Sequence, residues 1–295
     1  MIHPITFSIP EEKIVKTFPG KTKLLSDLIP GKIETYIYHT EEDYYNEYKQ
    51  SFFAITIKKA GWDCMRHYEI MANGCLPVFL DIEGCPENTM KLLPKDLFIA
   101  ANKLYEKMKD IPINNLTPYL GDYYNLLSKM LEYTRNYLTT RKLASYVLEK
   151  TLKTNAKKIL YLSGRVQPDY LRCLTLHGFK ELFGQNCHDF PKVSHIYKDY
   201  TKNPTELYGR GYSYTKLLDP ALYNSELDKT LEEDIKRKYY DIIIYGFFHR
   251  GTPYYELVKS VYPPDQVIFL CGEDIHYCEN DYLLNAGFHV FVREL

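Results

Sequence analysis

A short stretch near residue 60 carries an unusual density of side chains that can bind an anion or exchange a proton. Six of them lie within twelve positions: Lys58, Lys59, Asp63, Arg66, His67 and Glu69. The lysines follow an apolar run, and Gly61 precedes a segment with apolar residues at helical spacing. The N-terminus of a helix offers free backbone N–H groups that suit a phosphate, and Arg66 adds a planar fork of donors that suits a diphosphate.

Glu69 follows Arg66 by three residues and lies on the same face of the expected helix. A partly exposed carboxylate at this place can accept hydrogen bonds from two vicinal hydroxyls, such as those of a ribose. The segment therefore indicates a nucleotide-diphosphate site built from Lys58, Lys59, Asp63, Arg66 and Glu69. An exposed helix with an Arg66–Glu69 ion pair of little energetic consequence explains the spacing alone equally well.

The same segment resembles the nucleotide-sugar-binding segment of exostosin-like glycosyltransferases, which have the GT-B fold. That family's pattern is G-x-D-x-x-R-x-x-E and, after a short spacer, G-C-x-P-V. The matching positions here are Gly61, Asp63, Arg66, Glu69, Gly74, Cys75, Pro77 and Val78. The resemblance covers residues 51–94, under a fifth of the chain.

The resemblance implies a role for three of these residues: Glu69 contacts the ribose of the donor, while Arg66 and, less firmly, Lys58 contact its diphosphate. It implies a metal-independent hexosyl- or pentosyltransferase that needs no cofactor. The co-substrate is a nucleotide-diphosphate sugar, with a UDP-sugar favoured, and the acceptor is a glycan, a protein or a small molecule. The alternatives are another nucleotide-binding α/β enzyme, such as an epimerase or a nucleotide-processing hydrolase, and a non-catalytic sugar-binding module.

The elements that position these residues read as alternating strands and helices, the signature of parallel sheets. Strands are predicted at residues 5–9, 32–40, 51–59, 75–81, 157–164, 239–251, 265–276 and 288–295. Helices are predicted at 41–50, 61–74, 168–184 and 254–262, and one long helix at 122–153, which contains no Gly or Pro.

The predicted fold class is α/β, with two Rossmann-like parallel-sheet domains joined by the long helix. Residues 1–118 form the donor-binding domain, 119–156 the helical linker, and 157–295 a second domain for the acceptor and catalysis. GT-B enzymes usually have the acceptor domain first. The reversed order fits a circularly permuted GT-B whose last strand lies near its first, or a piece of a longer enzyme.

The proton acceptor of a sugar transfer is expected at the strand ends of the second domain, where active-site groups collect. The candidates are His249 and Arg250 after one strand, Glu273, Asp274 and His276 after another, and Arg165 with Asp169 after a third. We choose His249, Glu273 and Asp274 as the catalytic residues, because each follows a buried apolar run. No metal site is predicted: the spacing of Cys271, His276 and Cys278 matches no common zinc pattern, and no D-x-D triplet occurs.

The bulk composition narrows the partners and the compartment. A net charge of −1 gives no overall attraction to nucleic acid, which makes a nucleic-acid partner unlikely. The N-terminus lacks the pattern of a signal peptide, and no apolar run is long enough to span a membrane. Seven cysteines, an odd number in a chain of this length, are read as reduced thiols of a cytoplasmic protein.

Overall fold

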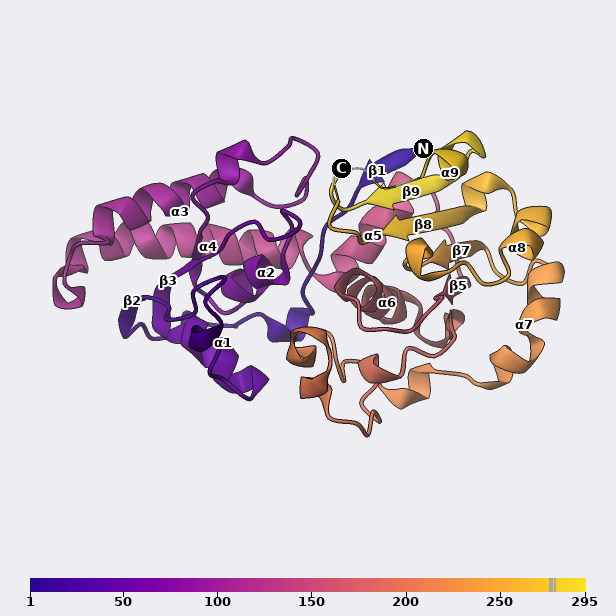
Figure 1. Cartoon of the computed structure of the whole chain (residues 1–295), viewed down its shortest axis with the longest axis horizontal. Coiled ribbons are helices and arrows are strands. Elements are labelled where there is room, and N and C mark those ends of the chain that lie inside the picture. The colour runs from indigo at the N-terminus through magenta and orange to yellow at the C-terminus, as the bar shows by residue number, and fades with distance from the viewer. Residues whose placement is uncertain (276–277, 279) are drawn as a thin grey trace.

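The computed structural model describes residues 1–275, 278 and 280–295, and it contains two parallel sheets (Figure 1). The larger sheet has the strand order β1 (Ile2–Pro4), β9 (His289–Val292), β8 (Val267–Cys271), β7 (Ile242–Tyr245), β5 (Ile159–Leu162), β6 (Cys187–Phe190). The smaller sheet has the order β2 (Lys23–Leu25), β3 (Ser51–Ile55), β4 (Leu76–Val78). The predicted α/β class with two parallel sheets is confirmed.

The six-stranded sheet is covered by helices on both faces, as its near-continuous apolar strands require. Alternate residues of β5 point to opposite faces, so that Ile159 and Tyr161 join one apolar core while Leu160 and Leu162 join the other. The first core includes α5 (Thr140–Lys150) and α6 (Tyr170–Phe183). The second includes α7 (Glu226–Lys236), α8 (Tyr255–Val261) and α9 (Asp281–Asn285).

The three-stranded sheet lies in the half of the molecule on the left in Figure 1, where four helices pack around it. These are α1 (Glu41–Gln50), α2 (Met65–Ala72), α3 (Lys95–Met108) and α4 (Leu120–Tyr137). The strand predicted at residues 32–40 is wrong. Residues Ile33–Thr35 form a turn of 3₁₀ helix, where the Thr35 hydroxyl accepts from the Ile29 N–H and donates to the Lys32 carbonyl. Ile33 is 86% exposed, so its β-forming side chain has no core to enter.

The first strand of the chain pairs with the last. β1 lies parallel to β9, with His3 opposite Phe291, and both termini lie beside this pair in Figure 1. The last strand was predicted to lie near a first strand at residues 5–9, and the structure pairs it with residues 2–4 instead. Residues 2–4 belong to the sheet of the predicted second domain, although the predicted first domain begins at residue 1.

The strand predicted at residues 5–9 is wrong, because these residues form the connection between the two sheets. Only the first of them continues the pairing of β1 with β9, and the others leave the sheet. The Ile5 N–H donates to the Val292 carbonyl, and Ile9 forms an isolated bridge with Thr139.

The single long helix predicted at 122–153 is two helices, α4 and α5. The chain leaves the helix at Leu138, and the Thr139 side chain accepts a hydrogen bond from the Lys142 N–H as the N-cap of α5. α4 packs against α2 and α3, whereas α5 packs against α6. The approach of α5 to α6 is close enough that a Cβ at Gly178 would lie 2.0 Å from the Thr140 carbonyl oxygen. The predicted linker thus contributes one helix to each half of the molecule.

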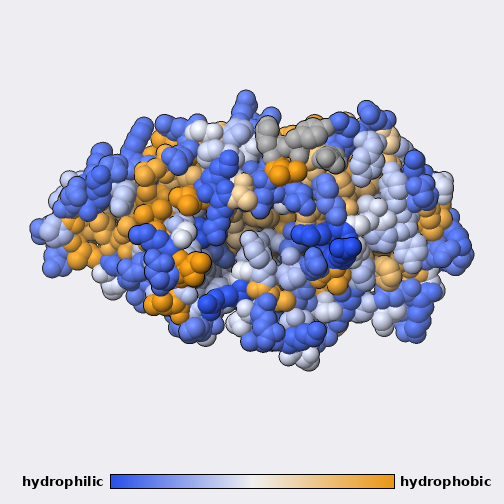
Figure 2. Space-filling view, in the orientation of Figure 1, coloured by the Kyte–Doolittle hydropathy of each residue, from blue (hydrophilic) through white to orange (hydrophobic). Residues whose placement is uncertain are grey.

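Two further features concern the surface and the cysteines. Figure 2 shows a face on which hydrophilic residues predominate. Within the described residues, no helix has both the length and the apolar character that crossing a membrane needs.

The prediction that all cysteines are reduced thiols is wrong for Cys271 and Cys278, which form a disulfide. The two cysteines are seven positions apart in the sequence.

Candidate functional site

A cavity of about 1230 Å³ lies where the carboxyl ends of both sheets meet. Its walls come from the segments that follow β2, β3, β5, β7 and β8, and from residues 206–212. The charged residues of the lining are Lys59, Arg66, Arg210 and Arg250, with Asp63, Glu69, Asp169, Glu206, Glu273 and Asp274. Ligands of open parallel sheets bind at this end of the strands. Residues 51–75 and residues 246–274, separated widely in the sequence, therefore contribute to one site.

Arg66 is the predicted binding residue with the most informative surroundings. It lies in the first turn of α2 and is only 7% exposed. Its Nη2 donates to the Tyr36 hydroxyl, while Nε and Nη1 are buried without a hydrogen-bond partner among the described residues. Buried polar donors normally have partners, because leaving one unpaired costs about 1–3 kcal/mol, and more when the group is charged. Arg66 therefore combines a place in the lining of the cavity with two buried donors that have no partner among the described residues.

Glu69 lines the same cavity, but it is not the partly exposed carboxylate that we expected. It is 5% exposed, and all eight residues of α2 are buried, which also excludes an exposed helix with a surface ion pair. Ser213 Oγ donates to Glu69 Oε1 at 2.6 Å, and the Tyr44 hydroxyl donates to Oε2 at 2.8 Å. Burial raises the pKa of the Glu69 carboxyl, and these two hydrogen bonds oppose the rise. Each oxygen keeps a further lone pair for a ligand, so the ribose contact stays a prediction.

Asp63 has a structural position in the wall of the cavity. It precedes the N-cap Cys64 and does not cap α2. Its carboxylate accepts from the Phe7 N–H at 2.7 Å and from the Tyr68 hydroxyl at 2.9 Å, and thereby ties the connection between the sheets to α2. Burial raises the pKa of Asp63 to about 6, against the positive charge of Arg293.

The two predicted lysines have different positions. Lys59 lines the cavity and is exposed, so its ammonium group can reach an anion there. Lys58 lies with its ammonium nitrogen 5.0 Å from the centre of the Trp62 ring, and it is not among the described residues of the lining. The structure therefore brings Lys59 together with Arg66 and leaves Lys58 outside.

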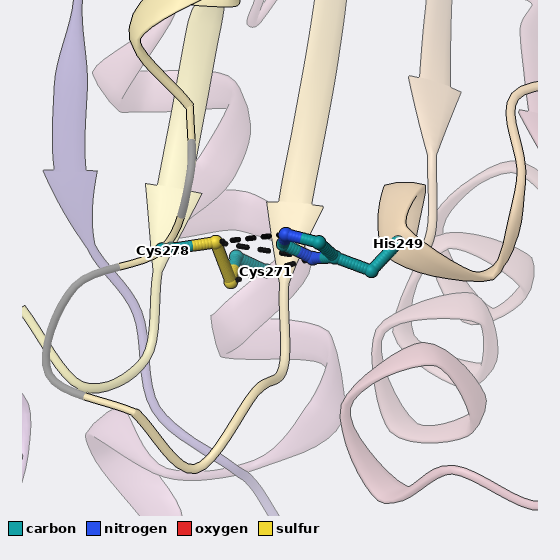
Figure 3. Close-up of side chains that lie close together, drawn as sticks. All are labelled: His249, Cys271 and Cys278. Atoms are coloured by element: carbon teal, nitrogen blue, oxygen red, sulfur yellow. Dashed lines mark hydrogen bonds between the residues drawn. A yellow bond between two sulfur atoms is a disulfide. The ribbon is translucent and has the colours of Figure 1, made fainter.

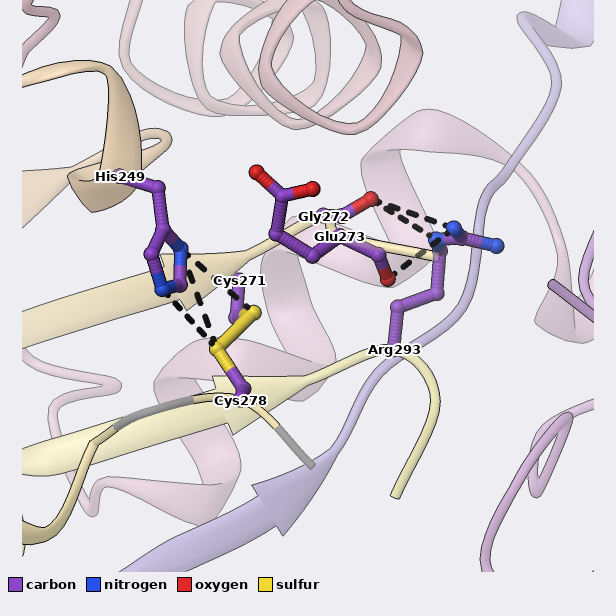
Figure 4. The surroundings of a disulfide bond; sticks show 6 residues. All are labelled: His249, Cys271, Gly272, Glu273, Cys278 and Arg293. Carbon is purple, nitrogen blue, oxygen red and sulfur yellow. Dashed lines mark hydrogen bonds between the residues drawn. A yellow bond between two sulfur atoms is a disulfide. The ribbon is translucent and has the colours of Figure 1, made fainter. Parts of the chain in front are cut away.

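Of the three predicted catalytic residues, Glu273 and Asp274 are among the described residues of the lining and His249 is not. The Asp274 carboxylate forms an ion pair with Arg293 and is 55% exposed. The Glu273 carboxylate points away from Arg293 (Figure 4). Arg293 donates a hydrogen bond to the backbone carbonyl oxygen of Glu273 instead. His249 lies against Cys271 and Cys278 (Figure 3). The candidate His276 lies outside the described residues.

Asp169 was a candidate that we did not choose, and the structure places it in the cavity wall. Its carboxylate accepts from the Arg172 N–H at 2.7 Å as the N-cap of α6. Burial raises the pKa of Asp169, and the Arg172 N–H and nearby arginine charges oppose the rise. Arg250, on the same side of the cavity, donates to Gln167 Oε1 at 3.3 Å.

The last residues of the chain were missed, although they hold the two halves of the site together. Glu294 accepts from the backbone N–H groups of Trp62 and Asp63 at 2.9 and 3.0 Å. Arg293 donates to the carbonyl oxygen of Gly272 at 3.2 Å (Figure 4). A pair of opposite charges directly after an apolar final strand was the available signal for this contact.

A second missed segment, residues 206–213, crosses from the larger half to the smaller one. Ser213 has a φ of 71° and donates its backbone N–H to Glu41 at 2.7 Å. Arg210, with a φ of 57°, donates to the Tyr38 carbonyl at 3.0 Å. Residues other than glycine rarely adopt such backbone angles. Such an irregular loop has no helical or strand periodicity, so no pattern in the sequence indicated it.

Comparison of the chain with protein-family models, with curated proteins and with solved structures finds no match.

Proposed function

We propose that the cavity binds a nucleotide-diphosphate sugar and that the protein transfers the sugar to a glycan, protein or small-molecule acceptor. The observation that carries this proposal is Arg66, a buried guanidinium with two unpartnered nitrogens in the wall of a large cavity. Lys59 and Arg250 add positive charge to the same lining. Such a site stabilises the charge that develops on a departing diphosphate without a metal ion.

The position of Glu69 indicates where the ribose of the donor binds. Glu69 lies one turn along α2 from Arg66, where its carboxylate reaches the ribose when Arg66 holds the diphosphate. The pairing of β1 with β9 is compatible with a circularly permuted GT-B arrangement, since it places the chain ends side by side.

We assign the proton acceptor to Glu273 in preference to His249 and Asp274. Glu273 lines the cavity, and its carboxylate has no hydrogen bond or ion pair with the described part of the chain. Asp274 is committed to Arg293, and His249 is directed to the sulfurs of Cys271 and Cys278. A carboxylate at the end of a buried strand is held rigidly enough to accept the acceptor's proton as the new bond forms.

A screen of UDP-, GDP- and CMP-sugars by thermal shift, followed by single-turnover transfer, tests the proposal. We expect one nucleotide-sugar class to raise the melting temperature and to support transfer by the disulfide-bonded protein that persists in EDTA. Glu273→Gln is expected to lower the transfer rate by roughly 10²- to 10⁴-fold with little change in donor affinity. The control Glu226→Gln changes an exposed carboxylate outside the cavity and leaves the rate unaltered.

The outcomes separate the alternatives. Stabilisation by a nucleotide sugar without transfer to any acceptor supports a binding module and rejects the enzyme. Stabilisation by NAD or ATP and by no nucleotide sugar supports another nucleotide-binding enzyme. Loss of transfer in EDTA that Mn²⁺ restores contradicts the metal-independent mechanism.

A further inference from the structure

Beside the cavity, three side chains from three separate segments meet at one point. His249 comes from the turn Phe248–Arg250 after β7, Cys271 ends β8, and Cys278 lies before α9 (Figure 3). The imidazole Nε2 lies 3.5 Å from the Cys278 sulfur, and Nδ1 lies 3.8 Å from the Cys271 sulfur. All three ligand atoms fall within 4.8 Å of one another.

We propose that His249, Cys271 and Cys278 bind a zinc-like divalent cation once the disulfide is reduced. One imidazole and two thiolates are ligands that Zn²⁺ prefers. Bonds of about 2.3 Å to sulfur and about 2.0 Å to nitrogen place tetrahedral ligands about 3.6 Å apart. The one imidazole nitrogen near both sulfurs is Nδ1, which lies 3.8 Å from the Cys271 sulfur and 3.9 Å from the Cys278 sulfur. These distances are close to that separation, so binding needs the two sulfurs to move apart and the imidazole to approach them slightly.

The burial of the sulfurs favours a metal over a pair of free thiolates. Cys271 and Cys278 are both buried, whereas His249 is exposed. Two thiolates in a buried place need a compensating charge, and a divalent cation supplies it. The imidazole adjoins both sulfurs, a placement that a disulfide alone does not require. Three protein ligands leave the fourth tetrahedral position for water or another side chain.

The site would hold the loop that carries Glu273 and Asp274. Arg293 donates a hydrogen bond to the Gly272 carbonyl at the start of this loop. The bond between the Cys271 and Cys278 sulfurs links the two ends of the loop (Figure 4). Where thiols are kept reduced, the disulfide does not persist, and the metal takes over its role. The disulfide and the metal-bound dithiolate are two alternative closures of the same loop.

The conversion of the disulfide into the metal-bound dithiolate balances in atoms and electrons. A phosphine and one water molecule convert the disulfide into two thiols and a phosphine oxide. The phosphine gives two electrons, and the water gives the oxygen of the oxide and both thiol protons. A divalent cation then binds the two sulfurs and releases these two protons to solvent.

Titration of the phosphine-reduced protein with Co²⁺, a spectroscopic substitute for Zn²⁺, tests the proposal. We expect one Co²⁺ per chain, a thiolate-to-cobalt charge-transfer absorption, and displacement by Zn²⁺. The oxidised protein is expected to show none of these. Cys278→Ser should lose most of the absorption, because it removes one of the two thiolates. His249→Ala keeps both thiolates and should bind Co²⁺ more weakly, with a changed cobalt spectrum. Cys85→Ser, which removes a free cysteine hydrogen-bonded to Thr89, should retain it.

Two results overturn the proposal. The first is a fully reduced wild-type protein, confirmed by titration of all seven thiols, that shows no thiolate-to-cobalt absorption. The second is an unchanged affinity for Co²⁺ and an unchanged cobalt spectrum in His249→Ala, which would show that the imidazole is not a ligand. Because the readout needs no sugar donor, its failure leaves the proposed transferase function untouched.

Discussion

Two buried arginines lie at the same cleft, and their surroundings differ sharply. Arg293 is 0% exposed and Arg66 is 7% exposed. The partners of Arg293 are the carbonyl oxygens of Asp63, Gly272 and Glu273 and the carboxylates of Asp274 and Glu294. Arg66 donates to the Tyr36 hydroxyl, and two of its nitrogens have no partner among the described residues.

The two arginines differ in how many of their donors are used within the protein. A buried charge is stable in the folded protein when its donors are all used, and Arg293 meets that condition. Arg66 does not, so the fold keeps a cost there that a bound anion would remove. The saturated arginine joins the two halves of the molecule, and the unsaturated one belongs to the lining of the cavity between them.

The largest effect is expected at the saturated arginine. Arg293→Met leaves the carboxylates of Asp274 and Glu294 without their cation, and we expect the free energy of unfolding to fall by about 3–5 kcal/mol. Chemical denaturation measures the change. The control Arg141→Met alters an exposed arginine on α5 and should cost under about 1 kcal/mol. Equal losses in the two variants would remove the structural role of Arg293.

A smaller effect is expected where the two halves meet at α2. Ser213→Ala removes the donor to Glu69 Oε1, and we expect a loss of about 1–3 kcal/mol in the free energy of unfolding. Ser260→Ala, at an exposed serine that bonds to the Leu257 carbonyl, is the matched control and should cost less. If Ser213→Ala is as stable as wild type, the loop of residues 206–213 does not hold the cleft together.

The smallest effect is expected in the pH dependence of the free energy of unfolding, through Asp63, which lies near Arg293. The pKa of Asp63 is raised from 3.8 to about 6 in the folded protein. Its contribution to stability is therefore fully present below about pH 4 and is lost as the pH rises through about 6. Asp63→Asn removes this dependence, so we expect its destabilisation relative to wild type to shrink between pH 4 and 7. A difference that grows over this range, measured by denaturation at each pH, contradicts the raised pKa.

The sequence was sufficient for the features that depend on local patterns. Continuous apolar runs predicted β5, β7 and β8, and helical spacing predicted α2 and α6. Because carboxyl ends of parallel strands gather ligand-binding groups, the sequence also placed Arg66, Lys59, Glu273 and Asp274 at one cleft.

The remaining features depend on tertiary contacts that local patterns do not contain. The β-rich residues 32–40 found no neighbouring strand, and Thr139 ended the long helical pattern because its side chain caps α5. Glu69 is buried by Ser213, 144 positions away. His249 meets Cys271 and Cys278 through the order of β7 and β8 in the sheet, which sequence spacing does not reveal.

Calorimetric titration of Arg66→Met tests most directly whether Arg66 binds the diphosphate of the donor, as we propose. With the nucleotide sugar that stabilises the wild type, we expect the dissociation constant of Arg66→Met to rise roughly 10²- to 10⁴-fold, because two charge-assisted hydrogen bonds of about 1.5–3 kcal/mol each are lost. Arg141→Met, titrated in parallel, should bind as the wild type does. A dissociation constant for Arg66→Met that equals that of Arg141→Met would contradict the account.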